Sequence, residues 1–137
     1  MEREDGIPRN PFINAGALIS TDTYLTGSSP KEALGQILRF IRAASDDEDI
    51  HINEMVARSE IATGHRNIAL AHYLASFGNL HAPADQVFGT YCHQCGVEMT
   101  CRQLALAGRF LVDAPQMPAL VSSVRICCCQ VICWEHR

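Results

Sequence analysis

The stretch SPKEALGQILRFIRAA, residues 29–44, indicates the class of fold. Ser29 and Glu32 have the spacing of a capping box, in which each side chain accepts a hydrogen bond from the other residue's backbone N–H, and Pro30 suits the first helical position. Four apolar residues then follow at i, i+3, i+4 and i+7, namely Leu34, Ile37, Leu38 and Ile41. The stretch predicts an amphipathic helix that ends near Ala44.

Two further helical patterns follow this helix. The acidic run at 45–49 suits a solvated turn, and a short helix is predicted after it from Asn53 to Glu60. Beyond ATGH (62–65), the next helix closes at Gly78, because glycine is common just after a helix C-terminus. Its predicted apolar stripe consists of Leu70, Ala71, Leu74 and Phe77.

The pattern continues with two more helices, which makes the chain mainly α. One runs roughly from Pro83 to Gly96, and its predicted apolar face consists of Val87, Phe88, Tyr91, Cys92 and Cys95. The other opens with the capping-box pair Thr100 and Gln103, and it is predicted to bury Leu104, Ala107, Gly108 and Leu111. The end of the chain, VSSVRICCCQVICWEHR (121–137), has no clean period and receives no assignment.

Composition limits the classes of function. The 137 residues are 47% hydrophobic and 19% charged, which is enough for about one domain with a core. A net charge of −4 and the absence of a basic run exclude an electrostatic footprint for nucleic acid or an anionic membrane. No segment approaches the roughly 18 apolar residues of a membrane span, and the first residues lack the apolar core of a signal peptide. The sequence predicts a soluble, cytoplasmic protein.

The 7 cysteines do not have the spacing of a secreted disulfide framework, and their odd number fits reduced thiols. Cys92, Cys95 and Cys101 resemble half of a zinc site, but the first two lie on the apolar face of a predicted helix. They are interpreted as buried, inert thiols, since free cysteine packs as a small hydrophobe. A zinc-binding module remains the alternative, with further ligands from the tail cysteines Cys127, Cys128, Cys129 and Cys133.

Ser28 and Lys31 match the Ser-x-x-Lys pattern, in which a lysine one helical turn on activates a serine nucleophile. The pattern overlaps the capping box at 29–32, and Lys31 is expected in an exposed first helical turn. A catalytic role for Ser28 and Lys31 is therefore disfavoured, and no other catalytic residue is identified in the chain.

Four polar residues stand out as candidates for ligand contacts. Asn14 lies within the apolar run NPFINAGALIS (10–20), where a buried amide without a partner costs ~1–3 kcal/mol. Glu60 and Asn67 flank a Thr-Gly turn that brings both toward one pocket. The Tyr91 hydroxyl has apolar neighbours and needs a partner if it is buried. A structural role and a ligand contact both remain open for each residue.

Four stretches, in this order and at these spacings, resemble the central third of the serine-dependent glutaminases: GIPRNPFINAGAL (6–18), ARSE (57–60), RNIALAHYLASFGN (66–79) and YCHQCGVEMTCRQLALAGRFL (91–111). The resemblance covers residues 3–112, which gives a partial glutaminase-like domain at 1–112 and a divergent Cys-rich tail at 113–137. It implies hydrolysis of L-glutamine to L-glutamate and ammonia by a homo-oligomer without metal or cofactor. It also implies an α+β fold like that of the serine β-lactamases and penicillin-binding proteins, with a helical subdomain beside an α/β subdomain.

The resemblance implies that Asn14, Glu60, Asn67 and Tyr91 bind the substrate. Their chemistry agrees with this role, because Glu60 suits the ammonium group of an amino acid and the two amides offer neutral donors. Tyr91 offers a hydroxyl near the reacting amide.

The nucleophilic serine and its lysine precede the NPFINAGA motif in the family, whereas this sequence begins only a few residues before that motif. The chain by itself is therefore predicted to be inactive. Its uncovered helix faces are expected to associate with a second copy or with a full-length relative. The alternative is a non-catalytic interaction fragment or a cysteine-rich metal-binding module.

Overall fold

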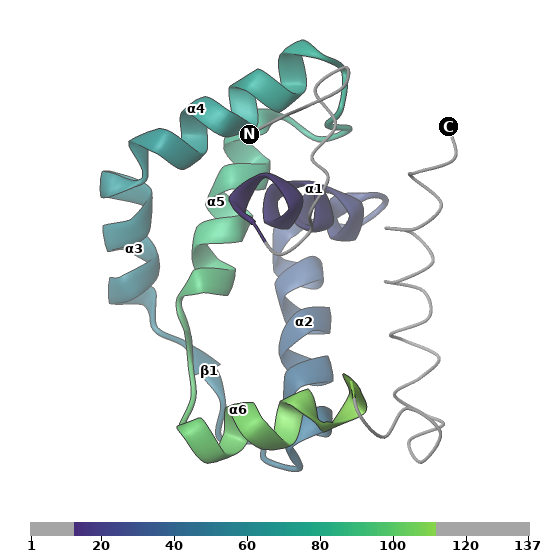
Figure 1. The fold of residues 1–137 in the computed structure, drawn as a ribbon, viewed down its shortest axis with the longest axis vertical. Helices are drawn as coiled ribbons and strands as arrows, with labels where there is room; N and C mark the ends of the chain where they lie inside the picture. Colours follow the sequence, from purple (N-terminus) through teal and green to yellow (C-terminus); the bar gives the residue numbers. More distant parts are fainter. Residues whose placement is uncertain (1–12, 112–137) are drawn as a thin grey trace. The chain divides into compact units, whose positions relative to one another are not determined.

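The computed structural model describes residues 13–111 and shows a mainly helical chain, as predicted (Figure 1). The elements in chain order are α1 (Asn14–Leu25), α2 (Pro30–Ser45), β1 (His51–Ile52), α3 (Glu54–Thr63), α4 (His65–Ser76), α5 (Ala84–Cys95), β2 (Val97–Glu98), α6 (Cys101–Ala107) and the 3-10 helix η1 (Gly108–Leu111). The tail at 113–137 lies outside the described residues. Within residues 13–111, no helix is both long and apolar enough to cross a membrane.

The described residues form two compact units, 13–34 with 52–96 and 35–51 with 97–111. The first unit contains α1, α3, α4 and α5, and the second contains most of α2 together with α6 and η1. The short strands β1 and β2 pair with each other in a two-stranded sheet. The predicted boundary at residue 112 falls at the edge of the described residues and stays a prediction.

Helix α2 begins as its sequence predicts. The backbone N–H of Ser29 donates to Glu32 Oε2 at 2.8 Å, and the backbone N–H of Glu32 donates to Ser29 Oγ at 3.3 Å. The Ser29 hydroxyl also donates to Glu32 Oε2 at 2.7 Å, and this bond, together with the one from the Ser29 backbone N–H, lowers the pKa of the Glu32 carboxyl because both favour its charged form. The predicted capping box is confirmed, and the helix ends one residue after Ala44.

The predicted α3 and α4 are present, with changes at their ends. The side chain of Asn53 caps α3 by accepting from the backbone N–H groups of Met55 and Val56, and the helix runs to Thr63 rather than ending at Glu60. Helix α4 ends two residues before Gly78, whose φ of 69° is the left-handed conformation that glycine adopts most easily. The prediction that Phe77 belongs to the buried stripe is wrong: its side chain is 47% exposed, because the helix has already ended.

Helix α1 had no counterpart in the sequence analysis. Its buried residues lie around much of its circumference, namely Ala15, Gly16, Leu18, Thr21, Asp22 and Leu25. A helix buried in this way lacks the polar face that produces an amphipathic period, and the preceding Ile13 provides no side-chain cap. Neither of the usual sequence signals was therefore present.

Helix α5 is the centre of the first unit. It packs against α1, α3 and α4, and α1 also packs against α4 (Figure 1). The buried cluster of the first unit consists of Leu18, Leu25, Ala33, Ala71, Leu74, Ala84, Val87, Phe88 and Cys92. The predicted apolar face of α5 is thus confirmed for three of its five members, while Tyr91 is half-buried and Cys95 is exposed.

Asp22, a residue of α1, holds the loop between α4 and α5 through hydrogen bonds. Its side chain is 2% exposed and accepts from the backbone N–H groups of His81 at 3.0 Å and Ala82 at 2.8 Å. The His81 ring Nδ1 lies 2.8 Å from the same carboxylate. A buried carboxylate needs such partners, and here they hold the loop after α4 on the first unit.

Helix α6 confirms the predicted start of the last helix but not its predicted burial. Its capping box is confirmed, since Thr100 Oγ1 accepts from the backbone N–H of Gln103 and the Gln103 side chain accepts from that of Thr100. The predicted burial is wrong: Leu104 is 61% exposed, and Ala107 and Gly108 are only partly buried. The amphipathic pattern marks a face that the described residues leave largely uncovered.

Candidate functional site

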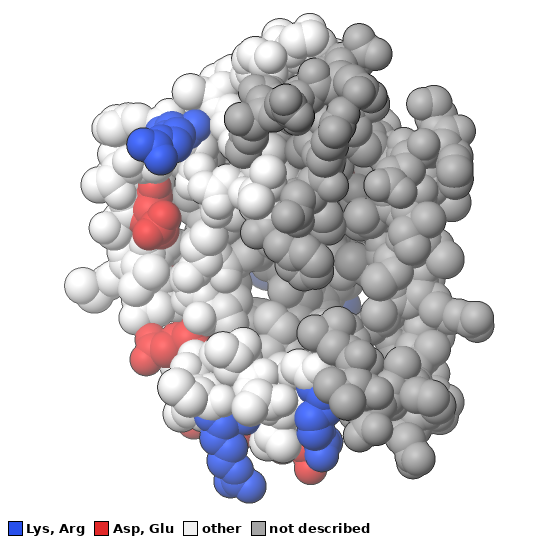
Figure 2. Space-filling model, in the orientation of Figure 1, with Lys and Arg blue, Asp and Glu red and all other residues white. Residues whose placement is uncertain are grey.

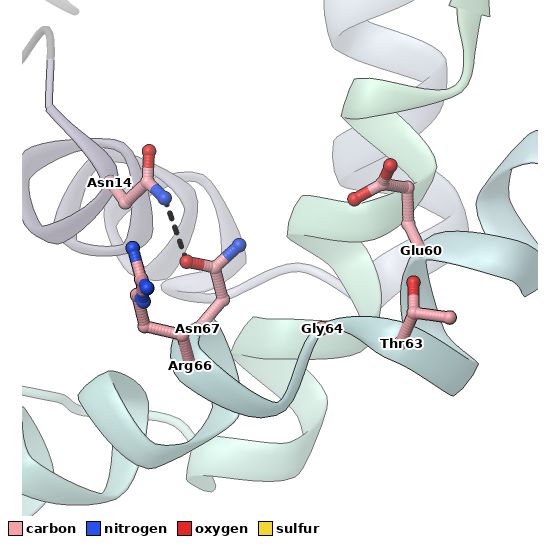
Figure 3. A pocket seen from close by; sticks show the side chains of 6 residues that line it. All are labelled: Asn14, Glu60, Thr63, Gly64, Arg66 and Asn67. Atoms are coloured by element: carbon pink, nitrogen blue, oxygen red, sulfur yellow. Dashed lines mark hydrogen bonds between the residues drawn. The ribbon is translucent and has the colours of Figure 1, made fainter.

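A polar cavity of about 390 Å³ lies in the first unit (Figure 3). It is lined by Asn14, Glu60, Thr63, Gly64, Arg66 and Asn67. These residues come from the first turn of α1, the last turn of α3, the single-residue turn at Gly64 and the first turn of α4. Three of the four residues predicted to bind substrate therefore line one cavity, and the fourth, Tyr91, does not line it.

A hydrogen bond joins Asn14 and Asn67, which both line the cavity. Asn14 Nδ2 donates to Asn67 Oδ1 at 2.7 Å, which links the start of α1 to the start of α4. Asn14 is exposed, so the expectation of a buried amide is wrong: its neighbours Ala15 and Gly16 are buried, while Asn14 faces the cavity. With Asn67 Oδ1 engaged, Figure 3 shows the Asn67 amide nitrogen directed toward the middle of the cavity.

Gly64 sets the sharp corner between α3 and α4. A Cβ atom at this position would lie 2.6 Å from the backbone oxygen of Glu60 and 2.8 Å from Cζ of Phe88. Its φ of −76° is open to any residue, so lack of space for a side chain, rather than conformation, favours glycine here. The close packing of the corner on α5 brings Glu60, before it, and Arg66, after it, to the same cavity.

The cavity contains one acidic and one basic side chain. Glu60 is partly buried at the end of α3, and Arg66 is exposed at the second residue of α4. Among the described residues, these two side chains do not form an ion pair with each other, and Figure 3 shows them on different sides of the cavity. The arrangement can hold a small molecule that carries both a positive and a negative group.

Tyr91 lies next to this site without lining it. Burial raises the pKa of its hydroxyl, and a hydrogen bond to the Cys95 side chain and the charge of Glu60 act in the same direction. The Tyr91 hydroxyl therefore has the partner that the sequence required, and it stays a neutral group at physiological pH. Because it is not among the lining residues, Tyr91 is the least direct of the four predicted contacts.

The cysteines in the described part of the chain differ in environment. Cys92 is buried, as predicted, and burial raises the pKa of its thiol to about 11. The prediction of a buried thiol is wrong for Cys95, which is exposed, and Cys101 is exposed as well. No group of three or more His, Cys, Asp or Glu side chains within residues 13–111 could hold a metal ion. The tail cysteines lie outside the described residues.

Ser28 and Lys31 do not belong to the cavity. The backbone N–H of Ser28 donates to the backbone oxygen of Leu25 in the turn after α1, and Lys31 is exposed in the first turn of α2. Neither side chain lines the cavity.

Three lining residues were not found by sequence reasoning: Thr63, Gly64 and Arg66. Arg66 had a usable signal, because it directly precedes Asn67 and carries the charge opposite to that of Glu60. Thr63 and Gly64 had no chemical signal of their own, since they reach the cavity through the shape of the corner.

A protein-family model described as Glutaminase matches residues 1–125. The chain belongs to the glutaminase family. This match confirms the resemblance and extends past residue 112, where the similar motifs end. On the face drawn in Figure 2, the basic and acidic side chains of the described residues form a few small groups, some of them next to each other.

Curated relatives agree with the family assignment. A glutaminase from Mesorhizobium japonicum is 55% identical over 124 residues, covering 90% of this chain and 39% of the relative. A glutaminase from Agrobacterium fabrum is 53% identical over 118 residues, covering 86% of this chain and 38% of the relative. This glutaminase-family chain spans about two fifths of the length of the curated relatives it matches.

Solved glutaminase structures match the fold. A Bacillus glutaminase in the presence of 4.3 M NaCl has a TM-score of 0.72 and 37% identity, covering 79% of this chain and 36% of that chain. A Bacillus subtilis glutaminase in a covalent complex with 5-oxo-L-norleucine, formed by reaction with 6-diazo-5-oxo-L-norleucine, has a TM-score of 0.69 and 38% identity, covering 76% of this chain and 35% of that chain. Bacterial glutaminases have the serine β-lactamase-like fold, as the resemblance implied.

Proposed function

We propose that this protein acts in the hydrolysis of L-glutamine to L-glutamate and ammonia, and that Asn14, Glu60 and Asn67 bind the amino-acid part of the substrate. The observation that carries the proposal is the cavity of this glutaminase-family chain, in which one carboxylate and two amides converge. The covalent complex of the Bacillus subtilis relative with 5-oxo-L-norleucine supports an amino-acid ligand.

The chemistry of the lining groups supports binding of a zwitterion. The Glu60 carboxylate accepts hydrogen bonds from an ammonium group, and amide N–H groups such as that of Asn67 donate to a carboxylate. Tyr91 is not among the lining residues, and its neutral hydroxyl, near Glu60, is hydrogen-bonded to the Cys95 side chain. A ligand that lacks one of these groups leaves a polar partner unpaired and binds more weakly.

Hydrolysis also requires a nucleophile and donors for the developing oxyanion. Among the described residues that line the cavity, the hydroxyl group belongs to Thr63, which donates to the backbone oxygen of Ser59 at 2.8 Å, and neither lysine nor histidine is among these lining residues. The 137-residue chain is therefore proposed to bind L-glutamine without hydrolysing it alone.

The test combines binding and turnover of the full chain. Isothermal titration with L-glutamine is expected to give binding that weakens at least about tenfold in Glu60→Gln, which keeps the shape and removes the charge. Glu48→Gln, an exposed glutamate in the other unit, is the matched control and is expected to bind like wild type. No binding by wild type, or equal loss in both variants, would contradict the proposal. Turnover lost in Ser28→Ala would make Ser28 the nucleophile after all.

The partner and location follow the family as part of the same proposal: a cytoplasmic homo-oligomer, or a chain that associates with a full-length relative. Exposed apolar side chains on the described residues support association, including Met55 at 82% and Leu104 at 61% exposure. The free thiols of Cys92, Cys95 and Cys101 support a reducing compartment. Light scattering of the purified chain distinguishes a monomer from an oligomer.

A further inference from the structure

Arg66 is placed where a cation is unfavourable for the helix that carries it. It is the second residue of α4, next to His65, and the first turn of this helix has no acidic residue. The N-terminal end of a helix has a partial positive charge, so a cation there is repelled and an anion is attracted. The negative charge of a bound carboxylate would offset both the partial positive charge of the helix end and the charge of the Arg66 guanidinium.

The cavity has a donor side and an acceptor side. Arg66 and Asn67 are neighbours on the first turn of α4, and Asn67 Oδ1 is occupied by Asn14, which leaves the Asn67 amide nitrogen as a donor. Glu60 faces them from α3 as an acceptor (Figure 3). Within residues 13–111, Glu60 and Arg66 do not pair with each other, so each keeps its charge for a ligand.

We propose that Arg66 is a specificity-determining residue that pairs with the α-carboxylate of the bound amino acid. This inference rests on the proposed function, in which Glu60 and the two amides bind the same ligand. The guanidinium offers several N–H donors in a planar fork that matches the two oxygens of a carboxylate. Arg66 thereby favours ligands with a free α-carboxylate over ligands that lack one, such as glutamine within a peptide chain.

Two probes and three variants test this role by isothermal titration on the full chain. The probes are L-glutamine and L-glutaminamide, in which an uncharged amide replaces the α-carboxylate. Arg66→Met is expected to weaken L-glutamine binding about 10- to 100-fold and to leave L-glutaminamide binding unchanged. Arg66→Lys keeps the charge and is expected to recover part of the loss. Arg58→Met, an exposed arginine on α3 outside the cavity lining, removes the same charge and is expected to bind both probes like wild type.

The outcomes separate this inference from the proposed function. If Glu60→Gln weakens L-glutamine binding and Arg66→Met does not, the cavity binds glutamine and the role of Arg66 is wrong. If Arg66→Met weakens both probes equally, Arg66 acts on the shape of the site and the inference is also overturned. If wild type does not bind L-glutamine at all, both the proposed function and the role of Arg66 are contradicted. A loss confined to L-glutamine and partly rescued by lysine supports the inference.

Discussion

Gly64, at the corner between α3 and α4, packs so closely on Phe88 of α5 that an added Cβ atom would lie 2.8 Å from the ring. We predict that Gly64→Ala lowers the free energy of unfolding by about 1–3 kcal/mol, because the corner or the ring has to move. The same movement displaces Glu60 relative to Asn67 and is expected to weaken L-glutamine binding. Chemical denaturation followed by circular dichroism measures the first effect, and titration measures the second.

Gly89 provides the matched control for this substitution. It lies inside α5, and an added Cβ atom there meets no atom within 4 Å. Alanine favours a helix interior over glycine, so Gly89→Ala is expected to stabilise the chain by about 0.5–1 kcal/mol. Equal destabilisation by both substitutions would show that the corner at Gly64 is not especially tight.

A polar side makes a helix predictable from sequence, and a capping residue indicates where the helix begins. Helix α2 has both, and its start and end were predicted to within one residue. Helix α1 has neither, because it is buried on several sides and supports no regular period. Leu104 shows the opposite limit: an amphipathic pattern identifies the apolar face of a helix but not whether another element covers it.

The candidate site was predictable only where chemistry marks a residue. Asn14, Glu60 and Asn67 are polar groups in apolar or turn contexts, and they line one cavity. Arg66 was missed because an arginine at the start of a helix usually belongs to the solvated surface. The hydrogen bond from Asn14 to Asn67, between residues 53 positions apart, depends on how α1 and α4 pack and has no local signal.

Asp22 is predicted to be the most sensitive polar residue in the first unit. Asp22→Asn replaces one acceptor oxygen by an amide that faces the backbone N–H groups of His81 and Ala82. The substitution is expected to cost about 1–3 kcal/mol in the free energy of unfolding, because a buried donor then meets other donors. Urea denaturation at pH 7 measures the change.

The control for Asp22 is Asp85, which lies 3.7 Å from His72 on the surface, with 84% of its side chain exposed. Exposed ion pairs contribute little, so Asp85→Asn is expected to change the free energy of unfolding by less than about 0.5 kcal/mol. A similar loss of unfolding free energy in both variants would mean that the hydrogen bonds between the loop and Asp22 stabilise the fold no more than an exposed ion pair does.

Arg66 is predicted to act in opposite directions on stability and on binding. Without ligand, Arg66→Met removes a cation from the N-terminal end of α4 and is expected to raise the free energy of unfolding by about 0.3–1 kcal/mol at low ionic strength. The gain is expected to shrink as salt screens the charge. Thermal denaturation at two salt concentrations measures it, with Arg58→Met as the control. Destabilisation by Arg66→Met would contradict the unfavourable position of the arginine.

The cysteines of α5 and α6 are predicted to differ in reactivity. Cys95 and Cys101 are exposed, whereas Cys92 is 1% exposed and burial raises the pKa of its thiol from 9.0 to about 11. Burial also raises the pKa of the Cys95 thiol, and the thiolate is the reactive form. Iodoacetamide at pH 8 is therefore expected to label Cys101 first, Cys95 more slowly, and Cys92 only when the chain unfolds, which peptide mass spectrometry detects. The raised pKa of the Cys92 thiol also determines how pH changes the stability of the folded chain. Between pH 9 and 11 the unfolded chain loses the thiol proton and the folded chain keeps it, so the contribution of Cys92 is complete below about pH 9. It is lost as the pH rises toward 11, by on the order of 2–3 kcal/mol. Rapid labelling of Cys92 in the folded chain at pH 8 would contradict its burial.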